Sequence, residues 1–554
     1  MRRKDLILIH PPSIFDFRKK PILWGPISDT VPSTPIFEMY PIGFMTIANY
    51  LHRNHYSVEI VNLAVRMMKD AKFDVVKYLS SLKAKVFGID FHWLPHVQGS
   101  LKIAHLLKKL HPDVPIVMGG LSATYYAQEI LENFPQIDFI VKGDSGEEPL
   151  LCLLREIERG KEEFSSVPNL SWRDREGRIH HNPITYVPDS LDHLNVDKWF
   201  LASFILKGRF NANHAPYYLW DKAPIGAILT CKGCIFNCVT CGGSCYTYSE
   251  FYSRRKIAFR SPKNLVEDLS LIDTFIRIPV YILGDIRQAG NRYVEEFLSR
   301  LRDERIDLPI IFELFTPAPK DFINSIARSV PDFGFSLSPE SADPEVRRAQ
   351  GRYYTNDAIE RTIVNSLEAG ASRFDLFFML GLGKESEQSV QTTFDYCLKL
   401  TKSFYKKNFY TFLSTLTPSL DPGSQAFEYP SIHGFRLRYK TLLEHYHAYS
   451  MPSWAYFINY STQNFSSNDI VELTYRVAYF TAELRRIHTN NKEEVDLIKS
   501  RIDASRLILR KIDEIMQIKD DVKREEELQR LTNIVQSDGG SRIVHTLEEL
   551  LREF

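Results

Sequence analysis

The sequence predicts an α/β protein made of two successive series of strands and helices, followed by a mostly helical C-terminal domain. Short β-type runs alternate with helical stretches over residues 1–160 and again over 223–417, and this alternation stops after residue 417. At 554 residues, with 44% hydrophobic and 25% charged residues, the chain has an ordinary globular composition and room for roughly two to four domains.

The first series predicts a doubly wound, Rossmann-like domain over residues 1–160. The expected strands are Leu6–His10, Ser57–Asn62, Lys85–Asp90, Val114–Met118 and Ile137–Val141, with helices between them such as Ile42–Arg53, Val97–Leu110 and Tyr125–Asn133. Short strands separated by helices indicate a parallel sheet that is covered on both faces. Ligands of such sheets bind beyond the carboxyl ends of the strands.

A connector is expected over residues 161–222. In it, two β-type runs, Val167–Trp172 and Ile179–Val187, flank the turn Asp174–Gly177 and predict a hairpin.

The second series, residues 223–417, predicts six βα units. The expected strands are 225–230, 279–284, 309–315, 333–338, 373–380 and 409–416. A closed eight-fold barrel would need two more units, so the pattern predicts a partial (β/α)6 barrel of the TIM type. Barrel chemistry takes place at the carboxyl ends of the strands, which directs attention to the residues that follow each strand.

Residues 418–554 are expected to be mostly helical. The stretch from Phe427 to Phe465 is dense in aromatic residues and is interrupted by prolines. Aromatic walls would suit an apolar substrate. The alternative is that these rings pack the segment over the mouth of the barrel.

Five of the seven cysteines lie in residues 230–245, directly after the first strand of the second series. Cys234, Cys238 and Cys241 have the spacing Cys-x3-Cys-x2-Cys. Three thiolates on one loop can hold three irons of a 4Fe–4S cluster and leave the fourth iron open to a small molecule. The alternative is a zinc site, for which Cys231 or Cys245 would supply the fourth ligand.

The cysteine spacing after a strand resembles that of radical S-adenosylmethionine (SAM) enzymes. The resemblance implies that the open iron chelates SAM and that an electron from the cluster splits SAM into methionine and a 5′-deoxyadenosyl radical. It also implies that Cys231 and Cys245 are not ligands. The chain departs from the family at Thr240, where an aromatic residue is usual next to the last cysteine.

Further parts of the family's SAM site are found where later strands end. Gly284 and Asp285 stand where the family has a Gly-Gly-Glu motif that contacts the SAM amino group, and Gly381 begins a glycine turn like the one beside adenine. Ser338 and Glu340 resemble the pair that binds the ribose and the polar head of SAM. The carboxylate of SAM would be met by an arginine, for which Arg347 or Arg348 is available.

The first series resembles the cobalamin-binding domain that precedes many radical SAM domains. The matching pieces are Pro11-Pro12, Pro41-Ile42-Gly43, Gly119-Gly120 and Gly143–Glu147. The resemblance implies a cobalamin site at Pro12, Gly119, Gly120 and Ser122, where small residues allow a close approach to the macrocycle. The Asp-x-His-x-x-Gly motif that places a histidine under cobalt is absent, so no such ligand is expected, and His10, His92 and His96 are interpreted as polar or core residues.

Charge and hydropathy exclude several other classes of protein. Lys+Arg and Asp+Glu both number 69, so no overall field favours nucleic acid or an anionic membrane. No run is long and apolar enough for a signal peptide or a membrane span. The clustered cysteines are unlike a secreted disulfide scaffold, and a cytoplasmic protein is expected.

Three functions are compatible with these observations. The first is methylation of an unactivated carbon through methylcobalamin. The second is radical C–C coupling or ring formation on an apolar substrate, such as cyclisation of an archaeal tetraether lipid. The third is a non-catalytic iron–sulfur or zinc protein. The expected partners are a small-molecule or lipid substrate and an electron donor such as flavodoxin or ferredoxin; no catalytic side chain is assigned.

Overall fold

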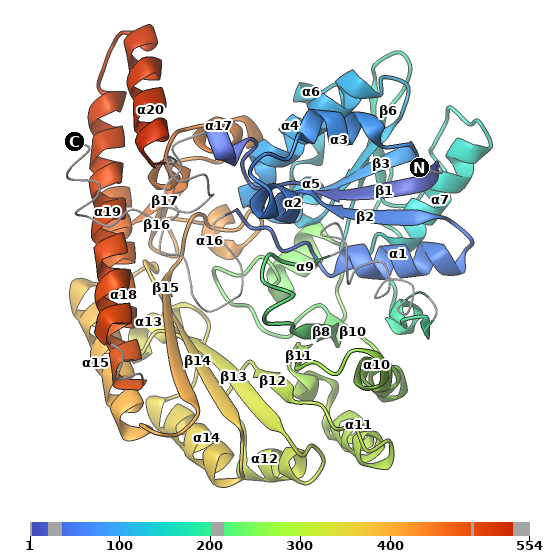
Figure 1. Ribbon diagram of the computed structural model, residues 1–554. Helices are drawn as coiled ribbons and strands as arrows, with labels where there is room; N and C mark the ends of the chain where they lie inside the picture. The colour runs from blue at the N-terminus through green and yellow to red at the C-terminus, as the bar shows by residue number, and fades with distance from the viewer. Residues whose placement is uncertain (1–2, 20–35, 199, 201–214, 489–491, 536–554) are drawn as a thin grey trace.

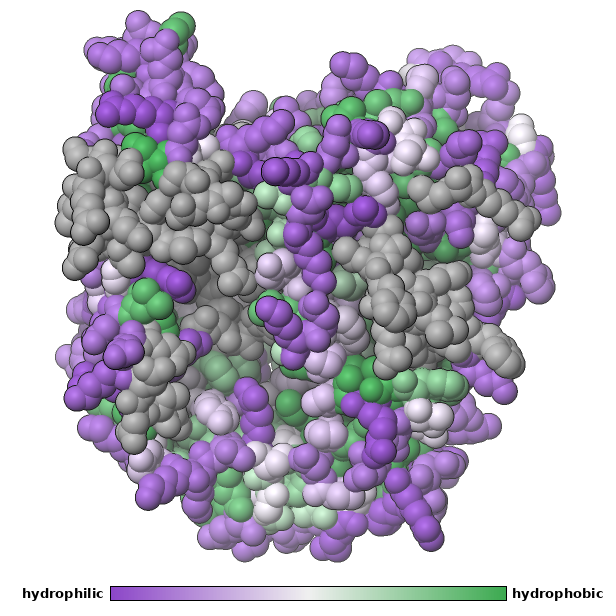
Figure 2. All heavy atoms as spheres, in the orientation of Figure 1, coloured by the Kyte–Doolittle hydropathy of each residue, from purple (hydrophilic) through white to green (hydrophobic). Residues whose placement is uncertain are grey.

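The computed structural model describes residues 3–19, 36–198, 200, 215–488 and 492–535. Figure 1 shows three parts: an N-terminal sheet with its helices, a second parallel sheet beside it, and a set of C-terminal helices along the edge of the second sheet. The face seen in Figure 2 is hydrophilic around its periphery, and hydrophobic residues gather near its middle, where the first two parts meet. In the part of the chain that the structure describes, no helix has the length and apolar composition needed to cross a membrane.

The N-terminal sheet contains five parallel strands in the order β2-β1-β3-β4-β5. They are β1 (Lys4–His10), β2 (Val58–Asn62), β3 (Ala84–Asp90), β4 (Ile116–Gly119) and β5 (Phe139–Val141). In β1, Leu6 and Leu8 belong to one apolar cluster, whereas Ile7 and Ile9 belong to another. Each face of the sheet therefore carries its own core, as the alternation of side chains along a strand requires.

Helices cover both faces of this sheet. Helices α1 (Gly43–Arg53) and α7 (Glu147–Glu158) pack on one face, and α4 (Val97–Leu110) packs on the other together with shorter helices. These shorter helices are α2 (Leu63–Lys69), α3 (Val75–Ser81), α5 (Leu121–Tyr125) and α6 (Ala127–Asn133). The expected doubly wound fold is confirmed, although the single helix expected at Tyr125–Asn133 is two helices that meet at Tyr126.

The hairpin expected in the connector extends the N-terminal sheet. Its strands are β6 (Leu170–Arg173) and β7 (Ile179–His181), and β6 pairs antiparallel with β5, which makes a sheet of seven strands. Trp172 is almost completely buried, and its ring packs edge-on against Phe164, which packs in the same way against Phe139. Burial of these three rings explains why the hairpin joins the sheet and does not stand apart in the connector.

The second sheet has six parallel strands that follow one another in the order of the chain. They are β8 (Gly226–Leu229), β11 (Val280–Leu283), β12 (Ile310–Leu314), β13 (Phe333–Glu340), β14 (Arg373–Leu380) and β15 (Phe409–Thr415). The covering helices are α10 (Pro262–Phe275), α11 (Asn291–Asp303), α12 (Lys320–Ala327), α14 (Asn356–Glu368) and α15 (Glu387–Ser403). Strands β8 and β15 are the two edges, so the barrel is open, as expected from six units.

The two faces of the second sheet differ in what they contact. The outward side chains of β14, such as Phe374 and Leu376, lie in the core beneath the helices. On the concave face lie Glu313 of β12 and Ser338 of β13. Phe377 of β14 and Phe412 of β15 stack on each other on the same face. The concave face is therefore polar near β12 and β13 and aromatic near β14 and β15.

The C-terminal part is not helical throughout. Before the long helices it contains α16 (Gln425–Glu428), β16 (Phe435–Leu437), α17 (Leu442–Ala448) and β17 (Tyr460–Thr462), and β16 pairs antiparallel with β17. The helices α18 (Ser467–His488), α19 (Lys492–Met516) and α20 (Asp521–Val535) follow. Many aromatic side chains of the 427–465 stretch are buried in the core, among them Phe427, Phe435, Tyr449, Trp454 and Tyr460. These five rings therefore pack inside the fold, as the second of the two interpretations expects. They are not available to line an open substrate cavity.

Candidate functional site

The cysteine loop lies at the carboxyl end of β8, between the short strand β9 (Cys231–Lys232) and α9 (Cys245–Phe251). Backbone hydrogen bonds shape it: the Cys241 N–H donates to the Cys238 carbonyl at 3.2 Å, and the Cys245 N–H donates to the Phe236 carbonyl at 2.9 Å. The structure thus places Cys234, Cys238 and Cys241 on one compact turn, as the spacing predicts.

Two of the three thiols accept hydrogen bonds from the backbone of the loop. The Phe236 N–H donates to Cys234 Sγ and the Gly243 N–H to Cys241 Sγ, both at 3.3 Å. Such donors tune iron–sulfur clusters by stabilising the negative charge on sulfur. Burial raises the pKa of the Cys234 thiol to about 11, so iron binding would have to displace its proton. The three thiols lie on one loop, but among the described residues no three His, Cys, Asp or Glu side chains are grouped closely enough to hold one metal ion, and cluster binding stays a prediction.

The other two cysteines of the stretch lie outside this turn. Cys231 is buried in β9, and its sulfur lies below Gly284, where an added Cβ would approach it to 3.0 Å. Burial raises the pKa of Cys231 to about 12. Cys245 is exposed in the first turn of α9. That neither cysteine binds the cluster stays a prediction, and their positions outside the turn are compatible with it.

The loop is held in place by two distant segments of the chain. The Val239 N–H donates to the carbonyl of Gln350, which follows α13 (Pro344–Ala349), and the Val239 carbonyl accepts from the Ala426 N–H. Gly351, at φ +84°, lies so close that a Cβ would meet the Asn237 carbonyl at 3.0 Å. The position of the cysteines thus depends on residues more than a hundred positions away.

At the end of β11, Asp285 is occupied by protein donors. Its carboxylate is buried and accepts from the side chain and backbone N–H of Arg287 and from the Phe315 N–H. Gly284, at φ +94°, donates its N–H to Glu313 at 2.6 Å, and a Cβ there would meet Thr230 Oγ1 at 2.6 Å. The direct contact of Asp285 with SAM stays a prediction, and the structure gives this residue a second role in shaping the loop.

Glu313 was not singled out from the sequence. It is the charged residue in the otherwise apolar strand β12, on the concave face and near the carboxyl end, and burial raises its pKa. A carboxylate inside an apolar strand at the active face of a barrel is a signal that could have identified it.

At the end of β13, Glu340 pairs with Arg352 at 2.8 Å, and Arg352 also donates to the Phe315 carbonyl at 3.1 Å. The arginines named from the sequence lie elsewhere. Arg347 is fully buried and donates to the carbonyl oxygens of Ser341, Ala342 and Tyr354, and Arg348 is exposed on α13.

Of the two arginines expected to be available for the SAM carboxylate, Arg347 uses its guanidinium within the fold, and contact of Arg348 with SAM stays a prediction. Arg352 is the arginine that pairs with Glu340 at this strand end, and Glu340 raises the pKa of Arg352 although burial alone would lower it. Nothing in its local sequence marked it.

At the end of β14, Gly381 begins the turn that resembles the family's adenine-binding turn. It has φ +77°, and its N–H donates to Glu385 Oε2 at 2.7 Å; the Leu382 N–H donates to the same oxygen at 3.3 Å. The Glu385 side chain is completely buried and therefore fixes the shape of this turn from below. Contact with adenine stays a prediction.

Burial raises the pKa of Glu385 to about 8 from its ordinary value of 4.5. Between these values the folded protein holds a proton that the unfolded chain has lost, so stability should fall as pH rises from 4.5 to 8. We expect a melting temperature that declines across this window in the wild type and declines less in Glu385→Gln. Glu295→Gln, at an exposed position on α11, is the control and should follow the wild type. Parallel curves for wild type and Glu385→Gln would contradict this.

The carboxyl edge of the N-terminal sheet holds the residues named for cobalamin. Gly120 has φ +118°, and a Cβ there would meet the His92 backbone nitrogen at 2.6 Å. The Ser122 hydroxyl donates to the His92 carbonyl at 3.0 Å. These two residues therefore join the turn after β4 to the turn after β3, and their contact with the cofactor stays a prediction.

Pro12 and Gly119 lie at the same edge. The Pro12 carbonyl packs against Gly99 of α4, where a Cβ would approach it to 1.8 Å, whereas a Cβ at Gly119 would only reach the Val141 carbonyl at 3.7 Å. The backbone at Gly119 is thus the more open of the two for a close approach by a flat ligand.

His10 and His96 are buried near this edge and fit the interpretation as core residues, whereas His92 is only partly buried. His10 is fully buried; its Nδ1 lies 2.9 Å from Asp90 and its Nε2 lies 2.9 Å from the Phe37 carbonyl. His96 Nε2 lies 2.9 Å from the same carbonyl. Both ring nitrogens of His10 are therefore engaged within the fold, and the lack of a histidine ligand to cobalt stays a prediction.

Two family models match separate segments of the chain. A family model for the B12 binding domain matches residues 31–151, and one for the Radical SAM superfamily matches residues 228–397. The chain is 22% identical over 400 residues to an uncharacterized methyltransferase of Pyrococcus horikoshii, over 70% of this chain and 78% of that protein.

Two further similarities cover different shares of the chain. The anaerobic magnesium-protoporphyrin IX monomethyl ester cyclase of Rubrivivax gelatinosus is 22% identical over 268 residues, which are 47% of this chain and 44% of that protein. The structure of the radical SAM methyltransferase TsrM from Kitasatospora setae, with cobalamin and a 4Fe–4S cluster bound, superposes with a TM-score of 0.60 at 16% identity, over 97% of this chain and 100% of that one. At this identity, the likeness shows the fold.

Proposed function

We propose that this chain, a radical SAM protein with an N-terminal B12-binding domain, uses a 4Fe–4S cluster, SAM and cobalamin to methylate an unactivated carbon. When bound, the cluster would supply the electron that cleaves SAM, and cobalamin would carry the methyl group. The substrate would be a small molecule or lipid, and an electron donor such as flavodoxin or ferredoxin would reduce the cluster. Similarity to a methyltransferase over most of both chains supports the reaction type.

One observation carries the proposal: the carboxyl edges of the two sheets meet. Asp144 and Ser145, which follow β5, contact Arg254 and Lys232 on either side of the cysteine loop. Ligands of both kinds of sheet bind beyond the strand ends. A cofactor at one edge would therefore lie next to a cofactor at the other, as transfer of a methyl group between them requires.

The chain's own residues would divide the work around these cofactors. Cys234, Cys238 and Cys241 would hold the cluster, and Glu340 with Arg352 would orient the polar head of SAM. Ser338 would reach the ribose from the concave face of the barrel, and Gly381 would let the backbone lie against adenine. The fold and the C-terminal segment would exclude water from the radical chemistry.

A second candidate is radical ring formation or coupling on an apolar substrate. The concave face of the barrel favours it locally, because Phe377 and Phe412 stack 4.9 Å apart there and are only partly buried. A partial similarity to a cyclase points the same way, although it spans less than half of either chain. The same apolar wall would equally serve the substrate of a methyltransferase, so methylation is preferred.

Labelled SAM separates the two reactions. Protein with reconstituted cluster and cobalamin is incubated with SAM carrying a trideuterated methyl group, a reductant and an extract of the native cells. Methylation predicts S-adenosylhomocysteine together with 5′-deoxyadenosine, and a methylated product in which the added methyl group carries all three deuterium atoms. Formation of 5′-deoxyadenosine and methionine without a labelled product would favour ring formation or coupling over methylation.

A further inference from the structure

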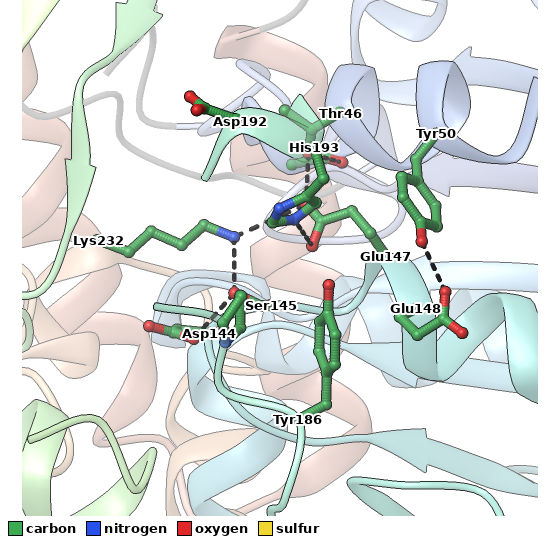
Figure 3. Close-up of polar contacts among 12 residues, drawn as sticks. Thr46, Tyr50, Asp144, Ser145, Glu147, Glu148, Tyr186, Asp192, His193 and Lys232 are labelled. Atoms are coloured by element: carbon green, nitrogen blue, oxygen red, sulfur yellow. Dashed lines mark hydrogen bonds and ion pairs between the residues drawn. The ribbon is translucent and has the colours of Figure 1, made fainter. Parts of the chain in front are cut away.

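A cluster of buried charges joins the loop after β5 to the radical SAM domain (Figure 3). The loop is Gly143–Glu147, one of the pieces through which the first domain resembles cobalamin-binding domains. Its side chains at positions 144, 145 and 147 are all buried, and all three contact cationic groups of the neighbouring domain. We call these three residues, together with Lys232 and Arg254, the clasp.

Lys232 is one half of the clasp. Its ammonium donates to the Ser145 hydroxyl at 3.2 Å and lies 3.7 Å from the Glu147 carboxylate. That carboxylate also accepts from Thr46 of α1 at 2.8 Å and lies 4.0 Å from His193 of the connector. Although burial alone would raise it, Lys232 and His193 bring the pKa of Glu147 down to about 2.

Arg254 is the other half. It forms an ion pair with Asp144 in which both side chains are almost inaccessible, at 2% and 3% exposure. Its guanidinium also donates to the Pro188 carbonyl at 3.0 Å. The Arg254 side chain passes over Gly233, where a Cβ would meet its Cδ at 3.1 Å. The two cations thus bracket Gly233, and the nearest cysteine, Cys234, is the next residue.

We propose that the clasp fixes the cysteine loop on the carboxyl edge of the B12-binding domain and so sets the relative position of the two cofactor sites, with Lys232 as a positioning residue. The consequence for catalysis rests on the proposed function; the coupling of the two loops does not. The side chains of Asp144, Ser145 and Glu147 already bind protein partners. The loop 143–147 is therefore assigned to contact between the domains.

The physical reason is the cost of leaving a buried charge without its partner. Among the described residues, removing Lys232 leaves the buried Glu147 with Thr46 and the more distant His193, and removing Glu147 leaves Lys232 with the Ser145 hydroxyl. Either loop would have to move or admit water. Since Lys232 is two residues before Cys234, such a movement reaches the cysteine turn directly. A displacement of about 1 Å between reacting groups costs about 10²-fold in rate.

The test compares Lys232→Met, Glu147→Gln and the double variant with Lys256→Met, an exposed lysine on the same segment. Hydrogen–deuterium exchange is followed in the reconstituted full chain for peptides covering 143–148 and 228–241. Each single variant should lose protection in both peptides, including the one that lacks the substitution. The double variant should lose less than the sum of the two, because the buried charge and its partner are removed together. Lys256→Met should match the wild type.

Product ratios then test the positioning role. In Lys232→Met, the yield of S-adenosylhomocysteine relative to 5′-deoxyadenosine should fall by about 10²-fold while iron content stays at the wild-type level. Unchanged exchange in the peptide opposite each substitution would overturn the clasp, and so would additive losses in the double variant. An altered exchange pattern with an unchanged product ratio would overturn the positioning role. If the wild type forms no S-adenosylhomocysteine at all, the proposed function fails while the exchange data still decide the clasp.

Discussion

A variant in which Cys234, Cys238 and Cys241 are all replaced by alanine is expected to bind no iron and to leave SAM intact. The three thiols lie on one turn at the carboxyl end of β8, and two of them accept backbone hydrogen bonds. Without thiolates, the remaining oxygen and nitrogen groups of the turn offer no ligands that suit an iron–sulfur cluster. Iron and sulfide analysis after anaerobic reconstitution, with the visible absorption spectrum, measures the first effect, and chromatographic assay of 5′-deoxyadenosine measures the second.

The matched controls are the two other cysteines of the stretch. Cys231→Ala and Cys245→Ala should each keep full iron content, since one sulfur lies below Gly284 and the other is exposed on α9. Cys231→Ala is expected to lower the melting temperature slightly, because it removes a buried sulfur from β9. Iron at the wild-type level in the triple variant would refute the ligand assignment. Loss of iron in either control would show that the replaced cysteine is itself a ligand of the cluster.

Weaker SAM binding is the expected result of Arg352→Met and of Glu340→Gln. The two side chains form a partly buried ion pair at the end of β13, and each change removes a charge-assisted hydrogen bond near the predicted SAM site. Losing such a bond costs about 1.5–3 kcal/mol. The dissociation constant for SAM should therefore rise by about one to two decades, with iron content unchanged. Equilibrium dialysis with radiolabelled SAM on the reconstituted protein measures this.

Arg348→Met serves as the control, because Arg348 is exposed on α13 and close to Arg352 in sequence. It should bind SAM like the wild type. Asp285→Asn tests a different point, since Asp285 accepts from Arg287 and Phe315. A loss of affinity there with full iron content would support the predicted contact with SAM. If Arg348→Met loses as much affinity as Arg352→Met, the arginine has been assigned wrongly.

The strands were predictable from the sequence because their determinants are local. Strand β14 was expected at 373–380 and lies at Arg373–Leu380, and the other strands of the second sheet agree to within two residues at each end. Apolar β-branched and aromatic runs bounded by helices specify a buried parallel strand without long-range information. The glycines that follow β11 and β14 were named through the resemblance to the family's motifs, and the structure gives both a positive φ, which glycine adopts most readily.

The aromatic stretch 427–465 and the hairpin were harder to place. A run of aromatic residues has the same composition whether it lines a cavity or fills a core, so the sequence could not decide between the two. The structure buries Trp454 and Tyr460 and leaves Phe377 and Phe412 partly accessible on the concave face. The hairpin was recognised, but its pairing with β5 depends on the packing of Trp172 against Phe164.

By itself, the sequence determined the two βα series, the open six-stranded sheet and the turn that carries Cys234, Cys238 and Cys241. Only the tertiary structure decided that Arg352 and not Arg347 faces Glu340, that Glu313 receives the Gly284 N–H, and that the loop after β5 clasps Lys232. The physical reason is the range of the interactions. Strand and turn formation depends on neighbouring residues, whereas a buried charge is placed by whichever distant partner compensates it, and that pairing leaves no mark in the local sequence.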